Sequence, residues 1–183
     1  MKVSASYAPA MFEDRRLRGA DRGMQVAVAY EHQRGAHVVD ISRGFAGELT
    51  EVLRTTRRQM PMHPSADLLS TLELDTRVIE VKARGGYGPL TILERQLDTF
   101  VCAGDVSWLY VVWNTTQPQP EELWLVQDPS RLEWRETRAA TKPSTEYFRG
   151  TRHEAEYQLA YPAVAAAGQR ADLSVMDDAV ITD

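Results

Sequence analysis

The sequence predicts an α/β domain with a mixed central β-sheet flanked by helices. Segments with helical spacing alternate with segments rich in β-branched and aromatic residues, and glycine- or proline-rich turns separate them. One segment, residues 108–113, is apolar throughout, as is typical of a strand covered on both faces. The expected order is helix, strand, strand, strand, helix, strand, strand, which favours helices packed on a central sheet.

The first half of the chain supplies one expected helix and three expected strands. Residues 21–34 have helical spacing, with Asp21 at the N-cap position and Gly35 at the position that ends many helices. Short β-branched or alternating patterns predict strands at residues 36–42, 48–54 and 72–82. Residues 57–67, with two prolines and a basic start, are expected to form a loop.

The second half begins with a glycine-rich turn and an expected helix. Thr91 and Glu94 have the spacing of a capping box, so we expect the helix to begin there. Strands are expected at residues 108–113 and 122–127. After Pro162 the chain is rich in alanine and acidic residues, which predicts a poorly ordered tail or a partner-binding segment.

Composition is ordinary for a soluble globular protein, with 43% hydrophobic and 26% charged residues among 183. Cys102 is the single cysteine, which excludes an internal disulfide and favours a cytoplasmic setting. No apolar run reaches the roughly 20 residues that span a bilayer, so no membrane association is expected. We expect three parts: an irregular N-terminal arm (residues 1–19), a folded domain (20–150) and a C-terminal extension with a partly disordered tail (151–183).

The net charge of −5 argues against a generally basic nucleic-acid binder. Residues 163–183 hold one arginine and four aspartates, a net charge of −3, so the rest of the chain carries −2. Such a domain can still bind phosphates through a local cluster of arginines. The candidates for this nucleic-acid contact, which can equally be solvated surface residues, are Arg54, Arg57, Arg58, Arg84 and Arg95.

Glu80 and Lys82 are the strongest candidates for chemistry. Residues two apart on a strand point to the same face, so both side chains project together from the expected strand 72–82. A carboxylate can hold Mg²⁺, and a neighbouring lysine can orient the water that attacks a phosphodiester. The alternative is an exposed ion pair of little energetic consequence, which is common on strands.

A second carboxylate is expected to complete the metal site, because one carboxylate seldom holds Mg²⁺ well. Glu48, at the start of the expected strand 48–54, is the candidate metal ligand beside Glu80, with Glu51 as the next choice. Glu31, on the upstream helix, is a further candidate catalytic residue. Zinc is not expected, because the four histidines have no metal-ligand spacing and there is no cysteine pair.

Several motifs occur in a specific order between about residues 22 and 138. They are Tyr-Glu-His-Gln-Arg-Gly at 30–35, Val-Asp-Ile-Ser at 39–42, Val-Ile-Glu-Val-Lys-Ala-Arg at 78–84, Leu-Thr-Ile-Leu-Glu at 90–94, Ser-Trp-Leu-Tyr-Val-Val-Trp-Asn at 107–114 and Val-Gln-Asp-Pro at 126–129. Together they resemble the restriction-endonuclease-like domain found at the C-terminus of the plant protein NO VEIN and attached to many bacterial helicases and defence proteins.

The resemblance implies a PD-(D/E)xK fold and Mg²⁺-dependent cleavage of DNA, often beside a helicase. It matches Glu31 with the family's helix glutamate, Glu80 with the strand carboxylate and Lys82 with the lysine. The sequence departs from the family at the first acidic position, where Glu48 stands in place of an aspartate.

Three functions remain open at this point. The first is an endonuclease that uses Mg²⁺, or Mn²⁺ in its place, to cleave DNA in a prophage or phage-defence context, with a helicase or another defence protein as partner. The second is a catalytically degenerate DNA-binding or assembly subunit of the same fold, which the departure at Glu48 favours. The third is an acidic inhibitor or DNA decoy. The sequence leaves the oligomeric state open, a dimer included.

Overall fold

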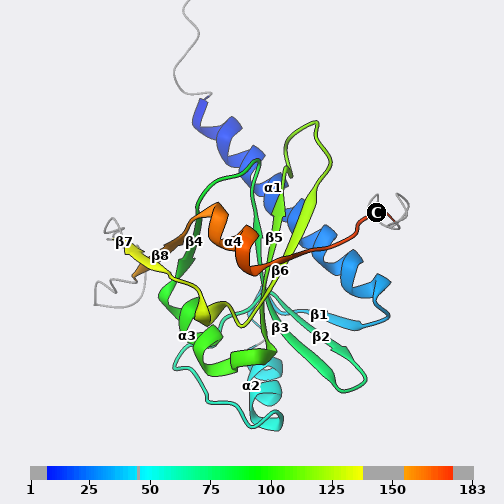
Figure 1. Cartoon of the computed structure of the whole chain (residues 1–183), viewed down its shortest axis with the longest axis vertical. Helices are drawn as coiled ribbons and strands as arrows, with labels where there is room; N and C mark the ends of the chain where they lie inside the picture. Colours follow the sequence, from blue (N-terminus) through cyan, green and yellow to red (C-terminus); the bar gives the residue numbers. More distant parts are fainter. Residues whose placement is uncertain (1–7, 45, 138–154, 175–183) are drawn as a thin grey trace, which may run out of the picture.

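A six-stranded mixed sheet runs through the middle of the molecule (Figure 1). The computed structural model describes residues 8–44, 46–137 and 155–174. The strand order is β1-β2-β3-β5-β6-β9, in which β3 and β5 are parallel and the other neighbours antiparallel. The bounds are β1 His37–Asp40, β2 Leu68–Leu72, β3 Asp75–Ala83, β5 Ser107–Trp113, β6 Glu122–Gln127 and β9 Gln169–Arg170. The predicted α/β fold with a mixed central sheet is therefore confirmed.

Helix α1, Ala8–Gln33, covers one face of this sheet (Figure 1). Its buried Val26 and Ala27 pack in one apolar cluster with Leu68 of β2 and Ile79 of β3. The helix begins well before the expected residue 21, so residues 8–19 are helical and not an irregular arm. Good helix formers (alanine, arginine, methionine, glutamate and leucine) make up most of this stretch, and the proline in it lies in the first turn, where a helix tolerates it. Among the described residues, no helix is long and apolar enough to cross a membrane.

Gly23 sets how closely α1 approaches β3. A Cβ atom at this position would lie 2.5 Å from the Cβ atom of Ala83. We therefore expect Gly23→Ala to push the helix off the strand and to lower the free energy of unfolding by about 1–3 kcal/mol. Gly47→Ala is the matched control, because nothing lies within 4 Å of its Cβ position in a helix; it should stabilise by up to about 1 kcal/mol. Urea denaturation measures both, and an unchanged Gly23→Ala would contradict the close contact.

The opposite face of the sheet carries α2, Ala46–Thr55, and α3, Glu94–Ala103. The expected strand at residues 48–54 is wrong, because this segment is part of α2. Its apolar residues Leu49, Val52 and Leu53 fit alternation in part and also the i, i+3, i+4 spacing of a helix. As a helix, this segment buries Leu49 and Leu53 in one apolar cluster. As a strand, it would also place these two side chains on one face, but this part of the sheet would then have no helix to cover it.

The expected strand at residues 72–82 is in fact the second arm of a hairpin with β2. Glu73 turns the chain with φ +53°, and β2 occupies residues that were expected to lie in or near a loop. The alternation across Leu72 hides this turn, because Glu73 and Asp75 continue the polar positions of the pattern. The consequence for the site is that the strand beside β3 begins at Leu68.

A second, smaller antiparallel sheet lies beside α3 with the order β4-β8-β7. Its strands are β4 Leu90–Leu93, β8 Glu156–Leu159 and β7 Arg135–Thr137. Thr91 therefore lies in a strand, and α3 begins at Glu94. Short 3-10 turns, Gly104–Val106 and Pro129–Arg131, precede β5 and follow β6.

The expected boundary at residue 150 does not separate a tail from the domain. Helix α4, Tyr161–Ala167, contributes the fully buried Val164 to the same apolar cluster as Leu159 of β8 and Phe100 of α3. Strand β9 then pairs with β6 at the edge of the main sheet. Residues 175–183, the acidic end of the expected tail, lie outside the described residues.

Candidate active site

Asp67 and Glu80 lie opposite each other on neighbouring antiparallel segments. β2 pairs with β3 in the register Leu68↔Ile79, and Asp67 directly precedes Leu68. One further step along this register brings Asp67 across from Glu80. The Asp67 N–H donates to the Ile79 carbonyl at 2.9 Å, and the Asp67 carboxylate accepts the Val81 N–H at 2.8 Å. Backbone hydrogen bonds therefore hold Asp67 beside the strand that carries Glu80.

Glu80, Lys82 and Gln96 form a contact network on the α3 face of the sheet. Glu80 is buried, and Lys82 Nζ lies 2.8 Å from Glu80 Oε1. Gln96 Nε2 donates to the same Glu80 oxygen, and Gln96 Oε1 accepts Lys82 Nζ at 3.2 Å. Gln96 Oε1 also accepts the Leu93 N–H at 2.9 Å, which ties the start of α3 to the site. The pair predicted from the sequence thus joins a buried carboxylate to a partly buried lysine that Gln96 braces, and it is not an exposed ion pair.

The surroundings of Asp67 and Glu80 disfavour the charged form of both carboxylates. Burial raises the pKa of Glu80, Lys82 opposes this rise and Asp67 adds to it, and the resulting pKa is about 7. Burial also raises the pKa of Asp67, although the Val81 N–H and Lys82 lower it. Glu80 Oε2 is buried and accepts no hydrogen bond from the described residues. Because Asp67 and Glu80 are close enough to interact, a proton shared between them would satisfy this oxygen.

Two neighbouring carboxylates are the kind of ligand that a hard divalent cation takes. Mg²⁺ is commonly held by one or two carboxylates, with water and substrate phosphate oxygens as its other ligands. Asp67 and Glu80 supply two carboxylates, and within the described ranges no donor reaches the buried Oε2 of Glu80. No cluster of three or more His, Cys, Asp or Glu side chains suited to a metal occurs in the described part of the chain. Glu80, Glu48 and Glu31 therefore do not converge, and the pair Asp67–Glu80 is the candidate metal site.

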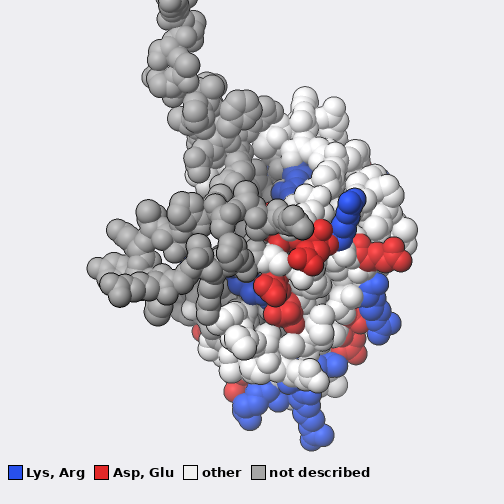
Figure 2. All heavy atoms as spheres, turned by 90° about the vertical axis from the view of Figure 1, so that its left-hand side faces the viewer, with Lys and Arg blue, Asp and Glu red and all other residues white. Residues whose placement is uncertain are grey.

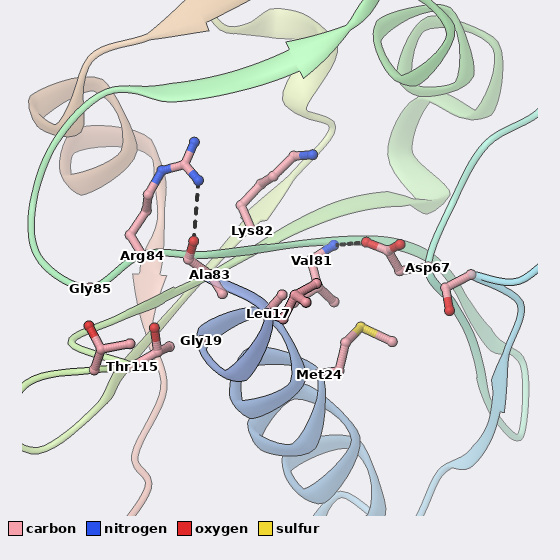
Figure 3. A pocket seen from close by; sticks show the side chains of 13 residues that line it. Leu17, Gly19, Met24, Asp67, Val81, Lys82, Ala83, Arg84, Gly85 and Thr115 are labelled. Atoms are coloured by element: carbon pink, nitrogen blue, oxygen red, sulfur yellow. Dashed lines mark hydrogen bonds between the residues drawn. The ribbon is translucent and has the colours of Figure 1, made fainter. Parts of the chain in front are cut away.

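A groove of about 580 Å³ leads to this site and is lined by Asp67 and Lys82. Figure 3 shows Lys82 and Arg84 on one side of β3, and Leu17 and Met24 of α1 on the other. β2 does not extend beside the last residues of β3, so the edge of β3 there borders the groove. A volume of this size is in the range of about 300–1,000 Å³ that holds small ligands. A ligand can therefore reach Lys82 and Asp67 from solvent.

Glu48 lies away from the candidate site. It is exposed in the first turn of α2, where it borders a surface pocket with His37, Val39 and Glu51. Its expected role as a metal ligand depended on a strand at residues 48–54, and the helix removes that geometry. Glu51, the second choice, is exposed and paired with Arg54 at 2.6 Å.

Glu31 is fully buried on the α1 face of the sheet, opposite the face that carries Glu80. Its carboxylate accepts hydrogen bonds from Ser70 Oγ at 2.5 Å, from Arg34 at 2.5 Å and from Tyr110 Oη. Arg77 lies 3.3 Å away and completes the network. These contacts compensate the Glu31 charge within the protein. Glu31 therefore connects α1 to β2, β3 and β5 and does not face the groove.

A substitution distinguishes a structural role for Glu31 from a role in the candidate site. Glu31→Ala leaves Arg77 and Arg34 facing each other with only Asp75 as a shared acceptor. We expect it to lower the free energy of unfolding by about 3 kcal/mol, since removing one partner of a buried ion pair is strongly destabilising. Urea denaturation measures this loss. Cleavage per folded molecule should stay within about threefold at a temperature where the variant is folded, and a complete loss there would return Glu31 to the site.

The five candidate arginines do not form one group. Arg84 lines the groove, where its guanidinium donates to the carbonyls of Ala83 and Pro89, and Arg95 on α3 is close enough to lower the pKa of Glu80. Arg54 pairs with Glu51 of α2, and Arg58 pairs with Asp105 in the turn after α3. Arg57, in a left-handed conformation, lies between them in sequence. Figure 2 shows acidic and basic side chains intermixed on one face, with several basic ones at its lower end. Arg84 and Arg95 are therefore the two that accompany the candidate site.

Comparisons of the chain with protein-family models, curated proteins and solved structures found no match. The resemblance to the NO VEIN C-terminal domain stays a prediction from its motifs.

Sequence reasoning missed Asp67 and Gln96. Asp67 has a recognisable signal once the turn at Glu73 is placed, because the antiparallel register then sets Asp67 opposite Glu80. Gln96 has a weaker signal: it occupies the N3 position of α3, where a Gln side chain commonly returns to the N-cap backbone. Thr91 and Glu94 match the capping-box pattern more closely than Leu93 and Gln96 do, so the helix was expected to begin too early in the chain.

Proposed function

We propose that this protein is a metal-dependent nuclease that hydrolyses phosphodiester bonds in DNA. The observation that carries the proposal is the carboxylate pair Asp67–Glu80, whose buried Glu80 Oε2 has no donor among the described residues, beside Lys82 in the lining of a groove. Two acidic residues and a lysine on adjacent strands are the arrangement that the PD-(D/E)xK resemblance implies. In this proposal Asp67 takes the first acidic position, which the sequence assigned to Glu48.

Asp67 and Glu80 would hold Mg²⁺, with Mn²⁺ as a substitute. When bound, the cation polarises the phosphate and lowers the pKa of a water ligand. The remaining steps belong to the chain itself. Lys82 would orient the attacking water and offset negative charge on the phosphate as the new P–O bond forms and the bond to the leaving oxygen breaks.

Gln96 would act as a positioning residue. Its amide contacts Glu80 through Nε2 and Lys82 through Oε1, so it holds the two functional side chains in one arrangement. Arg84, which lines the groove, would contact the phosphate backbone without reading sequence. The cytoplasmic setting and a helicase or defence-system partner belong to the same proposal, as implied by the single cysteine and by the resemblance.

A plasmid-cleavage assay tests the proposal. The purified protein should convert supercoiled DNA to nicked or linear forms with Mg²⁺ or Mn²⁺ and stop when EDTA is added. Absence of cleavage of plasmid, linear duplex and single-stranded DNA at millimolar Mn²⁺ would contradict it.

A catalytically degenerate DNA-binding subunit is the second candidate. The ion pair between Lys82 and Glu80 favours it, because it satisfies one carboxylate oxygen without a metal. This alternative predicts DNA binding that neither EDTA nor Glu80→Gln alters, together with no cleavage. Binding is measured by fluorescence anisotropy with a labelled duplex.

A further inference from the structure

A second pocket, of about 500 Å³, is lined by residues of two loops that also border the groove at the candidate site. Parallel pairing of β3 with β5 continues through hydrogen bonds from the Arg84 N–H to the Val112 carbonyl and from the Thr115 N–H to the Arg84 carbonyl. The loops at residues 84–87 and 114–117 therefore leave the sheet side by side. Gly85 and Thr115 line the first groove, whereas neighbouring residues on these loops line the second pocket.

Tyr87 presents an aromatic side chain in this second pocket. It is 53% exposed, although the groups around it hold it in place. Its ring lies 4.7 Å from that of Tyr161 with an interplanar angle of 38°, and 5.7 Å from that of the fully buried Trp113. A hydrogen bond with Glu122 raises the pKa of the Tyr87 hydroxyl, so that end is anchored as well. An exposed but fixed ring is a suitable stacking surface.

Three amide side chains share this pocket with the ring. Asn114, Gln117 and Gln119 line the same pocket. Asn114 is held in a left-handed conformation, φ +64°, and donates to the Pro120 carbonyl at 3.1 Å. Gln117 and Gln119 are exposed, and their side-chain amides make no hydrogen bond to any described residue. Their donors and acceptors are available to a ligand.

We propose that this pocket binds an unpaired nucleobase of the strand that is cleaved at Lys82, with Tyr87 stacked on the base and the glutamine amides on its edge. The inference rests on the proposed nuclease function. Tyr87 follows Lys82 closely in the chain, so their Cα atoms lie at most about 18 Å apart, a span of a few nucleotides. A paired base has both faces stacked and its edge occupied, so the pocket selects single-stranded DNA or an unpaired nucleotide near the cut.

The test measures binding in EDTA, so that no cleavage occurs. The probes are a single-stranded 12-mer with one 2-aminopurine, a 12-mer made of abasic sites throughout, and the matched duplex. We expect the 2-aminopurine fluorescence to be quenched on binding, and Tyr87→Ala to weaken single-strand binding by about 5- to 100-fold, as for loss of one stacked base. Tyr87→Phe should bind within about twofold of wild type, and the duplex should be insensitive to both variants.

Two controls keep the result interpretable. Leu74→Ala removes a fully exposed apolar side chain at the distant β2–β3 turn and should change no affinity. Because Tyr87 packs on Trp113, a thermal melt accompanies each variant, and the double variant Gln117→Ala, Gln119→Ala tests the pocket from exposed positions alone. That variant should weaken single-strand binding and leave duplex binding unchanged.

Three outcomes overturn the base pocket: unchanged single-strand affinity in folded Tyr87→Ala, equal binding of the abasic strand, or no quenching in wild type. A Mg²⁺ cleavage assay on the same strands separates the two proposals. Cleavage without any dependence on Tyr87 removes the pocket and keeps the nuclease. Tyr87-dependent binding without cleavage removes the nuclease and keeps the pocket.

Discussion

Lys82→Ala is expected to slow Mg²⁺-dependent DNA cleavage by about 10²–10⁴-fold, the usual contribution of a positioned group that assists proton transfer. Lys82 Nζ contacts Glu80 Oε1 and Gln96 Oε1, so alanine removes the ammonium while both partners keep their contact with each other. Lys82 is also partly exposed at the groove, and its loss should not unfold the protein. The measurement is the initial rate of plasmid nicking at saturating metal.

Asp67→Asn and Glu48→Gln form a matched pair for the same assay. Each changes one carboxylate to its amide, but Asp67 stands across from Glu80 whereas Glu48 is exposed on α2. We expect about 10²-fold or more loss of activity for Asp67→Asn, because an amide is a poor substitute for a charged metal ligand. Glu48→Gln should cleave at the wild-type rate. The opposite pattern would restore the assignment made from sequence alone.

Glu80→Gln is expected to stabilise the metal-free protein at pH 8 by about 3 kcal/mol, from a pKa raised to about 7 and 1.36 kcal/mol per unit. The native state must bury the Glu80 charge, and glutamine avoids that cost. The new glutamine side chain would keep an oxygen for Gln96 and Lys82, while its amide nitrogen would replace the oxygen that has no donor and could donate to Asp67.

The pH dependence follows from the direction of the shift. The folded-state pKa of Glu80 is about 7 and the ordinary value is 4.5, so between these two the native state binds more protons than the unfolded state. The destabilisation by Glu80 is therefore absent below about pH 4.5 and complete above about pH 7. Urea denaturation in EDTA at pH 5 and pH 8 should show a gain for Glu80→Gln that is much larger at pH 8. A gain independent of pH, or a loss at pH 8, would contradict a buried, poorly compensated carboxylate. Glu48→Gln, at an exposed position, is the control and should show no gain in stability at either pH.

The sequence predicted the sheet where single-strand patterns were unambiguous. Residues 108–113 are apolar throughout and form β5 in the middle of the sheet, and the alternation around Glu80 and Lys82 correctly placed both on one face of β3. These features depend only on local periodicity, and that periodicity can be recognised in a single sequence. The segment 48–54 failed because its apolar spacing suits a strand and a helix equally, and tertiary packing against Leu69 and Val78 decided between them.

Which residues make up the site depends on the strand register, and local sequence patterns do not determine that register. Asp67 belongs to the site because the chain turns at Glu73, two residues before β3 begins, and a turn one residue later would face a different side chain toward Glu80. Glu31 was predicted for the site because a helix carries it just upstream, but α1 packs on the face opposite Glu80. Which face a helix covers is a property of the whole fold.

Calorimetric titration of Mn²⁺ into the metal-free protein tests the central claim, that Asp67 and Glu80 form a divalent-cation site. The account predicts one site at millimolar or lower Mn²⁺ in wild type and in Glu48→Gln, and no saturable binding in Asp67→Asn. No heat of binding in wild type at millimolar Mn²⁺, or equal binding in Asp67→Asn, would contradict it.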